Sequence, residues 1–226
     1  MSPTGKDIAA EAEVLRLARL LDVDVATLGF LEGIEAGELR ELRRLATDAL
    51  FDADSATLAR LAAAGKLLPT GLVAAISERA FGPLLAARVT SYMDPGRAAD
   101  VGKHLDPTFL ADICVQLDPR SAKKIIPRME LETVLAVTEE LLERGDFVTL
   151  GRFVGTMPHD ALGDVLEITE DDELLRICAV AESAAGIDEI FEMLSDERLE
   201  DIRRVAAGKG LKGEALVLRD RLSATS

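Results

Sequence analysis

Residues 93–128 read MDPGRAADVGKHLDPTFLADICVQLDPRSAKKIIPR, and within them the dipeptide Asp-Pro returns at a strict interval of twelve residues. Aspartate is a strong helix N-cap because its carboxylate accepts hydrogen bonds from free N–H groups of the first turn. Proline is tolerated at the first helical position, where its missing N–H has no role. The spacing therefore predicts a series of short helices, each beginning at a proline. The three dipeptides are Asp94-Pro95, Asp106-Pro107 and Asp118-Pro119.

Apolar residues keep the same interval. In the second unit Leu105 precedes the cap, and Leu110 can pack against it as a hydrophobic staple, with Ile113 on the same helical face. The pattern extends to about ten units if residues 141–144 are an insertion and the later caps are Asp146, Ser183 and Ser195. The predicted inward pairs are Ala86 and Val89, Ala98 and Val101, Leu110 and Ile113, Ala122 and Ile125, Val134 and Val137, Leu150 and Phe153, Leu162 and Val165, Leu174 and Ile177, Ile187 and Ile190, and Leu199 and Ile202.

A helix of roughly nine residues is marginal alone in water, so each unit must bury its apolar stripe against neighbours. That requirement is typical of repeat arrays. The chain is therefore expected to be all-α, with an α-solenoid, or superhelix, that winds to the right or to the left. The short step predicts antiparallel or sharply crossed successive helices, so that two units make a hairpin of about 24 residues.

Three regions follow along the chain. Residues 1–66 are expected to form an N-terminal helical cap with helices at 7–21, 35–50 and 55–64. On the second of these helices Leu39, Leu42, Leu45, Ala46 and Ala49 are expected to share one face. Residues 67–205 form the repeat array, and residues 206–226 form a glycine-rich hinge with a last helix at 214–222.

The formal net charge of −15 disfavours nucleic acid and anionic lipid as partners, and it is compatible with a basic protein or divalent cations. Cys114 and Cys178 are expected to be buried thiols in a reducing compartment. The first residues lack a signal-peptide core, and no apolar stretch approaches membrane-spanning length. The composition thus predicts a soluble cytoplasmic protein without membrane insertion.

The stretches MDPGRAADV, LDPTFLADI and LDPRSAKKI resemble the intracellular N-terminal domain of MgtE-type magnesium transporters. They are more distantly similar to the helical modules of the flagellar motor switch protein FliG. The resemblance covers residues 81–205 and fades after Arg128. It implies a superhelical fold and a soluble regulatory or docking module, with sensitivity to Mg²⁺ as one implication. Because the repeats extend nearly to Ser226, no counterpart of the CBS and channel domains of those transporters is expected within these residues, and no family metal ligand maps onto them.

The remaining short motifs do not predict a catalytic site. The segment FDADSATL, with Asp52 and Asp54, matches the hydrophobic-Asp-x-Asp pattern of haloacid-dehalogenase-like phosphatases, but the sequence before it is helical, whereas that nucleophile follows a strand. His104 and His159 lie at expected helix junctions without catalytic companions. We therefore expect no enzyme, no catalytic or metal-binding residue and no bound cofactor.

An acidic segment at residues 159–173 is the sharpest remaining feature. Asp160, Asp164, Glu167 and Asp171 recur at helical spacing, so that they could hold hydrated Mg²⁺ or Ca²⁺ on one face. A solvated face is the simpler interpretation, because acidic residues are also favoured in first turns and a unit boundary near Thr169 interrupts the helix.

Three functions remain open. The first is a non-catalytic helical-repeat scaffold or regulatory module that binds another protein of unknown identity. The second is a Mg²⁺-responsive regulatory module related to the transporter domains, and the third is a phosphatase-like hydrolase. A homodimer is also compatible with the pattern, because the open end of an array leaves apolar surface uncovered.

Overall fold

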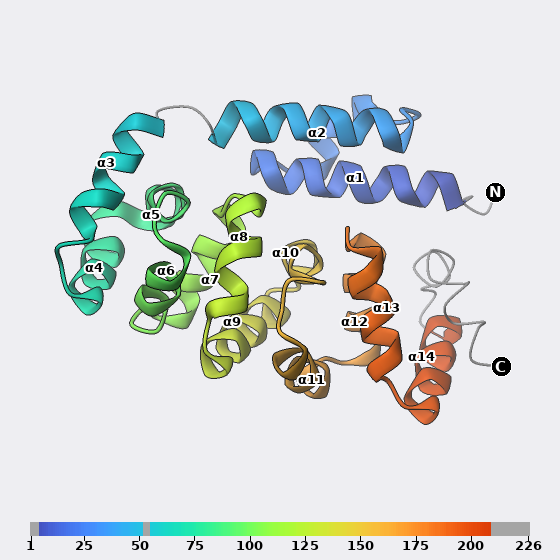
Figure 1. Ribbon diagram of the computed structural model, residues 1–226. Coiled ribbons are helices and arrows are strands. Elements are labelled where there is room, and N and C mark those ends of the chain that lie inside the picture. Colours follow the sequence, from blue (N-terminus) through green and yellow to red (C-terminus); the bar gives the residue numbers. More distant parts are fainter. Residues whose placement is uncertain (1–4, 52–54, 209–226) are drawn as a thin grey trace. The chain divides into compact units, whose positions relative to one another are not determined.

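The structure, a computed structural model, describes residues 5–51 and 55–208, and every regular element in these ranges is helical (Figure 1). They contain fourteen α-helices, three short stretches of 3-10 or π helix and no strand. The all-α prediction is therefore confirmed for these ranges. None of their helices is both long enough and apolar enough to cross a bilayer.

The helices follow one another with short connections. Their bounds are α1 Gly5–Leu21, η1 Val25–Leu31, α2 Ala36–Phe51, α3 Ser55–Gly65, α4 Thr70–Ile76, η2 Ser77–Phe81, α5 Gly82–Thr90, α6 Pro95–Gly102, α7 Pro107–Gln116, α8 Pro119–Ile125, η3 Ile126–Arg128, α9 Leu131–Glu143, α10 Phe147–Phe153, α11 His159–Ile168, α12 Asp171–Val180, α13 Ala184–Met193 and α14 Asp196–Gly208.

Each Asp-Pro dipeptide begins a helix. The carboxylates of Asp94, Asp106 and Asp118 accept hydrogen bonds from backbone N–H groups of the first turns of α6, α7 and α8. The shortest of these bonds measures 2.8 Å, from the N–H of Arg120 to Asp118. No helix runs through a second proline of the series, so the predicted interruption every twelve residues is confirmed.

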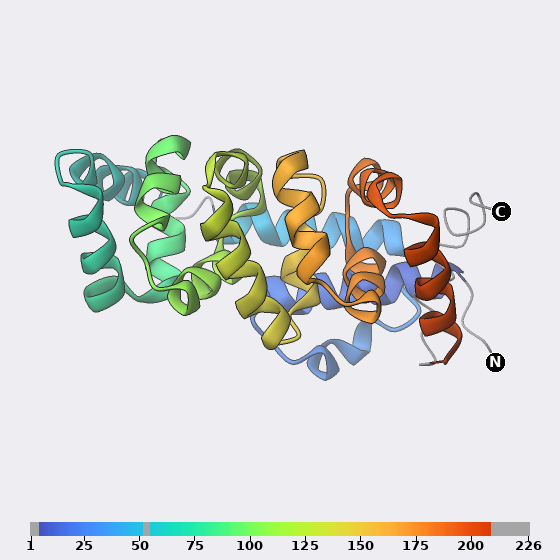
Figure 2. The ribbon, with the colours of Figure 1, turned by 90° about the horizontal axis from the view of Figure 1, so that it is seen from below.

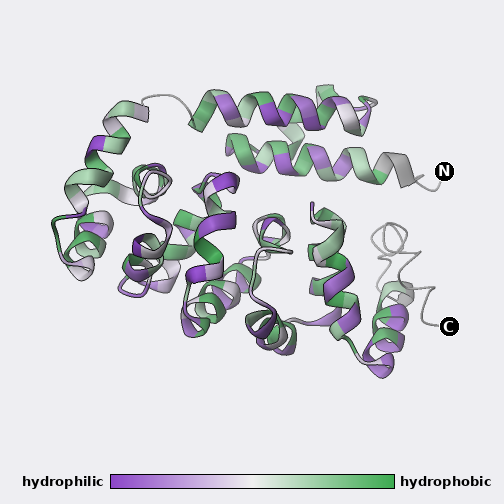
Figure 3. Ribbon diagram, in the orientation of Figure 1, coloured by the Kyte–Doolittle hydropathy of each residue, from purple (hydrophilic) through white to green (hydrophobic). Residues whose placement is uncertain are grey.

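The predicted inward face is confirmed as well. All twenty residues of the ten predicted pairs are buried, down to a fully covered Ile202. The later caps are also as predicted, because Asp146, Ser183 and Ser195 each accept a backbone N–H of the following helix. The expected insertion lengthens α9 to 13 residues. Figure 3 shows hydrophobic and hydrophilic residues alternating along the helices, as amphipathic helices require.

The chain divides into two compact units. One unit comprises residues 47–144 and 156–164, and in it α-helices pack mainly on the second helix along the chain rather than on the next one. The pairs are α3 with α5, α4 with α6, α5 with α7, α6 with α8 and α7 with α9, and their elements are seen from a second side in Figure 2. Small residues allow this packing, since Ala86 and Ala87 of α5 form a buried cluster with Ile113 of α7.

The other unit comprises residues 1–46, 145–155 and 165–226, and its described part centres on α1, which packs on η1, α10 and α12. Helices α1 and α2 lie side by side and run in the same direction (Figures 1 and 2). Their core combines Leu17, Ala18, Leu28, Leu31 and Leu39. A parallel pair needs a connection that returns along the whole first helix, and here η1 forms the middle of it. Sequence reasoning did not predict η1.

The predicted face of α2 is wrong in part. Leu39 is fully buried, but Leu42 and Leu45 are 43% and 53% exposed. Ala49, assigned to the same face, is exposed too. The reason is polar: Arg43 points toward α1, where its guanidinium meets a buried carboxylate, so the buried stripe of α2 is rotated away from the two leucines.

The expected hinge at residue 206 does not begin there, because α14 continues as a helix to Gly208. The remaining part of that hinge and the expected helix at 214–222 lie outside the described residues.

A close backbone contact joins α13 to the segment after α10. Gly155 has a positive φ of 77°, which favours glycine. A Cβ placed on Gly186 would lie 2.5 Å from the nitrogen and 2.6 Å from the Cα of Gly155. Only a glycine therefore fits position 186 while α13 keeps its place.

Replacing the cap residues tests the twelve-residue pattern. Asp94→Ala and Asp106→Ala should each lower the free energy of unfolding by about 1 kcal/mol, because each leaves N–H groups of a first turn without an acceptor. Urea unfolding followed by circular dichroism measures this difference. The control is Glu139→Ala, at an exposed position of α9. If the cap variants unfold like the control, the caps do not define the helices.

Gly186→Ala should destabilise the chain by about 3 kcal/mol, because α13 must move away from Gly155 to admit the methyl group. Gly37→Ala, with nothing within 4 Å of the added Cβ, is the matched control and should stabilise α2 slightly. Thermal and urea unfolding of both variants measure the change in the free energy of unfolding. Equal stability of the two would show that the glycine contact is not tight.

Candidate functional site

A cavity among the described residues lies along α1 and is open to solvent on one side. Its volume is about 760 Å³, which is within the range of ligand and peptide sites. We call it the α1 groove. It is lined by Ala10, Glu11, Val14, Leu15, Val25, Ala26, Leu28, Gly29, Leu31, Glu32, Gly33, Ile34, Glu35 and Ala36.

The local sequence explains the groove. Asp24 caps η1 by accepting the N–H of Ala26 at 2.8 Å, and Gly33, with a φ of 84°, turns the chain toward α2. In a 3-10 helix residues three apart lie above one another. Val25, Leu28 and Leu31 therefore form one ridge, and the groove runs between this ridge and α1.

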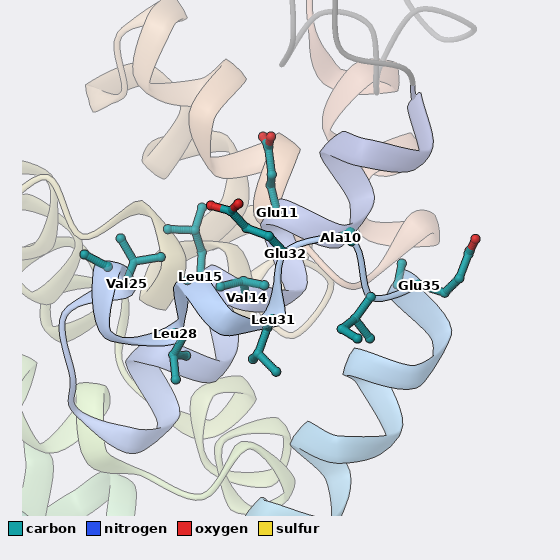
Figure 4. A pocket seen from close by; sticks show the side chains of 14 residues that line it. Ala10, Glu11, Val14, Leu15, Val25, Leu28, Leu31, Glu32 and Glu35 are labelled. Carbon is teal, nitrogen blue, oxygen red and sulfur yellow. The ribbon is translucent and has the colours of Figure 1, made fainter.

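The groove is apolar inside and acidic at its edge. Leu28 and Leu31 are buried, whereas Val25 and Ile34 remain 44% and 38% exposed. Figure 4 shows Glu11 and Glu32 projecting to the same side near the middle of the cavity, with Val25 at one end and Glu35 at the other. None of the lining residues that the structure describes is a lysine or an arginine.

A smaller cavity of about 360 Å³ lies on another side of α1 and shares Glu11 and Leu15 with the α1 groove. Here Arg19 of α1 forms a 2.7 Å ion pair with Asp146, the cap of α10. The guanidinium of Arg176 lies 5.8 Å from the centroid of the Phe147 ring, a cation–π distance. This cavity is therefore of mixed charge, and its arginines are held by neighbouring side chains.

Between α1 and α2 lies a buried carboxylate with three arginines. Glu13 is fully buried and accepts from Arg16 at 2.7 Å, Arg40 at 3.1 Å and Arg43 at 3.0 Å. Burial alone raises the pKa of Glu13, but the charges of Arg16 and Arg43 and hydrogen bonds from Arg43 and Arg40 outweigh it, so the pKa lies below its ordinary value of 4.5.

The same arginines extend the network to the end of α12. Arg16 donates to the carbonyl oxygens of Val180 at 2.8 Å and Ala181 at 2.9 Å. Arg43 also pairs with Glu182 at 2.9 Å. These bonds satisfy the free carbonyls of a helix C-terminus and fix α1, one wall of the groove, on both α2 and α12. Sequence reasoning missed this network, since its members are far apart in sequence.

The structure places the predicted candidates as follows. His104 and His159 are both exposed. Asp160, Asp164 and Glu167 belong to α11, whereas Asp171 begins α12 and pairs with Arg198 at 3.0 Å. Among residues 5–51 and 55–208 no three histidine, cysteine or acidic side chains meet as a metal site would require. Cys114 and Cys178 are free and buried, as expected. Asp52 and Asp54 lie outside the described residues.

Comparison of the chain with models of known protein families, with curated proteins and with solved structures finds no match. The fold defines the class as an all-α helical protein. The resemblance to the magnesium transporter domain stays a prediction.

The Glu13 network gives a pH prediction. Because the pKa of Glu13 is lowered in the folded state, its stabilising effect is present above pH 4.5 and is lost as the pH falls through the folded value. Glu13→Gln should lower the free energy of unfolding by about 3 kcal/mol at neutral pH, since buried Arg16 loses its partner. Urea unfolding across the acidic range should show this difference shrinking toward low pH.

The control is Glu41→Gln. Glu41 pairs with Arg44 at 2.6 Å, but both side chains are 57% exposed, so stability should hardly change. A constant difference between wild type and Glu13→Gln at all pH values would contradict the assigned direction of the pKa shift.

Proposed function

We propose that this chain is a non-catalytic helical-repeat scaffold that binds a segment of another protein in the α1 groove. The observation that carries the proposal is the groove itself: an open apolar cavity of about 760 Å³ whose walls keep several large side chains partly in water. Apolar surface of this kind is costly to leave exposed and is typical of interaction sites.

Large apolar side chains in and beside the groove remain partly exposed to solvent, as a binding surface requires. Leu15 is 37% exposed, and Val25 and Ile34 are exposed to a similar degree. Phe30, also in η1, is 76% exposed, and an exposed aromatic next to a groove is a common anchor in protein interfaces. One wall of the groove, α1, is fixed by the Glu13 network, which lowers the cost of ordering that wall on binding.

The alternate-helix packing of α3 to α9 supports an α-solenoid of either hand, a class of fold that presents extended binding surfaces. Two free buried cysteines fit a reducing compartment, and we propose the cytoplasm. A homodimer stays a prediction. The Mg²⁺-responsive module rests on the sequence resemblance and on acidity, and the phosphatase reading rests on Asp52 and Asp54; both stay predictions too.

The test is affinity capture with the full chain carrying Val25→Asp and Ile34→Asp. A partner that uses the groove should be recovered about tenfold less, because the two charges desolvate poorly against an apolar segment. The matched control carries Leu42→Asp and Leu45→Asp, two residues of similar exposure on α2 that do not line the groove. Circular dichroism checks that both variants keep their helices.

Recovery that survives the groove substitutions, or that falls equally in the control, would show that the α1 groove is not the binding surface. Quantitative mass spectrometry of the captured proteins distinguishes these results.

A further inference from the structure

We infer that the segment bound in the α1 groove is a cationic amphipathic helix, with one apolar stripe flanked by lysines or arginines. This inference rests on the proposed function and adds the chemistry of the partner. Three observations support it: the shape of the groove, the carboxylates at its edge, and the arginine partners of other carboxylates in the same unit.

The shape suits a helix. The ridge from Val25 to Leu31 spans seven residues of a 3-10 helix, and the six steps between its ends cover about 12 Å. Apolar anchors at positions i, i+3, i+4 and i+7 of an α-helix span about 10 Å. One ridge of the groove therefore matches two turns of an entering helix, with Val14 and Leu15 of α1 on the facing wall.

The edge charges select the flanks of that helix. Glu11, Glu32 and Glu35 line the groove, and they make no ion pair with any described residue. Three carboxylates beside an apolar floor attract lysine and arginine and repel phosphate or acidic side chains. The net charge of −15 adds long-range attraction for cations, so the whole chain favours such a partner's approach.

Elsewhere in the same unit carboxylates near packed surfaces are neutralised. Asp146 pairs with Arg19, Asp171 with Arg198, and Glu13 with three arginines. The acidic edge of the α1 groove is thus a place where burial by a partner would require that partner to bring the positive charge.

The experiment uses the full chain and two synthetic helical peptides of equal length. Both carry the same leucine stripe, with lysines on its flanks in one peptide and glutamates in the other. Fluorescence anisotropy at low salt should show the lysine peptide binding at least about tenfold more tightly, and the difference should shrink at high salt. A lysine peptide of scrambled order, which lacks the stripe, should bind about tenfold more weakly than the ordered one.

Charge reversal places the binding at the groove. Glu32→Lys with Glu35→Lys should weaken the lysine peptide about tenfold and strengthen the glutamate peptide. Glu192→Lys with Glu197→Lys changes the net charge equally at two exposed positions outside the groove and should alter both affinities less than about twofold.

Each other result overturns the inference. Equal weakening in the two double variants, or equal binding of the scrambled peptide, would mean that net charge alone attracts the lysines. Equal binding of both ordered peptides would leave the groove as a docking site but remove its preference for cations. Binding of neither peptide would exclude a cationic amphipathic helix, while the capture experiment with Val25→Asp and Ile34→Asp separately decides whether the groove binds a protein.

Discussion

The interaction on which the repeated helices depend is the hydrogen bond from a first-turn N–H to a capping carboxylate, with proline as the next residue. It begins each helix, and the next Asp-Pro pair ends the helix before it, because the residue before a proline disfavours helical backbone. The helices that begin after Asp94 and Asp106 have eight and ten residues, too few to be stable alone, and α8, which begins after Asp118, has seven. Such helices persist because each buries two apolar side chains at fixed positions after its cap, and the burial of each valine, leucine or isoleucine among them contributes about 1.5–3 kcal/mol.

Much of the fold was predictable because capping and amphipathic spacing are local. From the twelve-residue interval and the later cap residues the sequence predicts which side chains turn inward, and Leu110 with Ile113 and Leu199 with Ile202 are buried accordingly. The prediction failed on α2 because the buried face there is chosen by a distant partner. Glu13, 30 residues away from Arg43, draws that arginine inward, and no local pattern reveals an ion pair across such a separation.

The candidate site was less predictable for the same reason. Paired carboxylates and histidines are the usual sequence signals of a site, and by composition the acidic segment at residues 159–173 is the strongest such signal in this chain. The groove arises instead where Val25, Leu28 and Leu31 come to face Val14 and Leu15, and these residues look like ordinary core positions. A cap at Asp24 followed by apolar residues three apart was the available signal, although a short 3-10 helix has too few turns to stand out in a sequence.

Helices α1 and α2 run in the same direction, and this geometry sets a minimum length for the chain that joins them. A helix of 17 residues is about 25 Å long, so the return path needs at least about eight extended residues. The fourteen residues between Leu21 and Ala36 exceed that limit, and the surplus is coiled into η1. A linker shortened to that limit would be fully extended and would contain no η1. A natural variant with such a deletion would therefore lose the α1 groove while α1 and α2 stayed packed together.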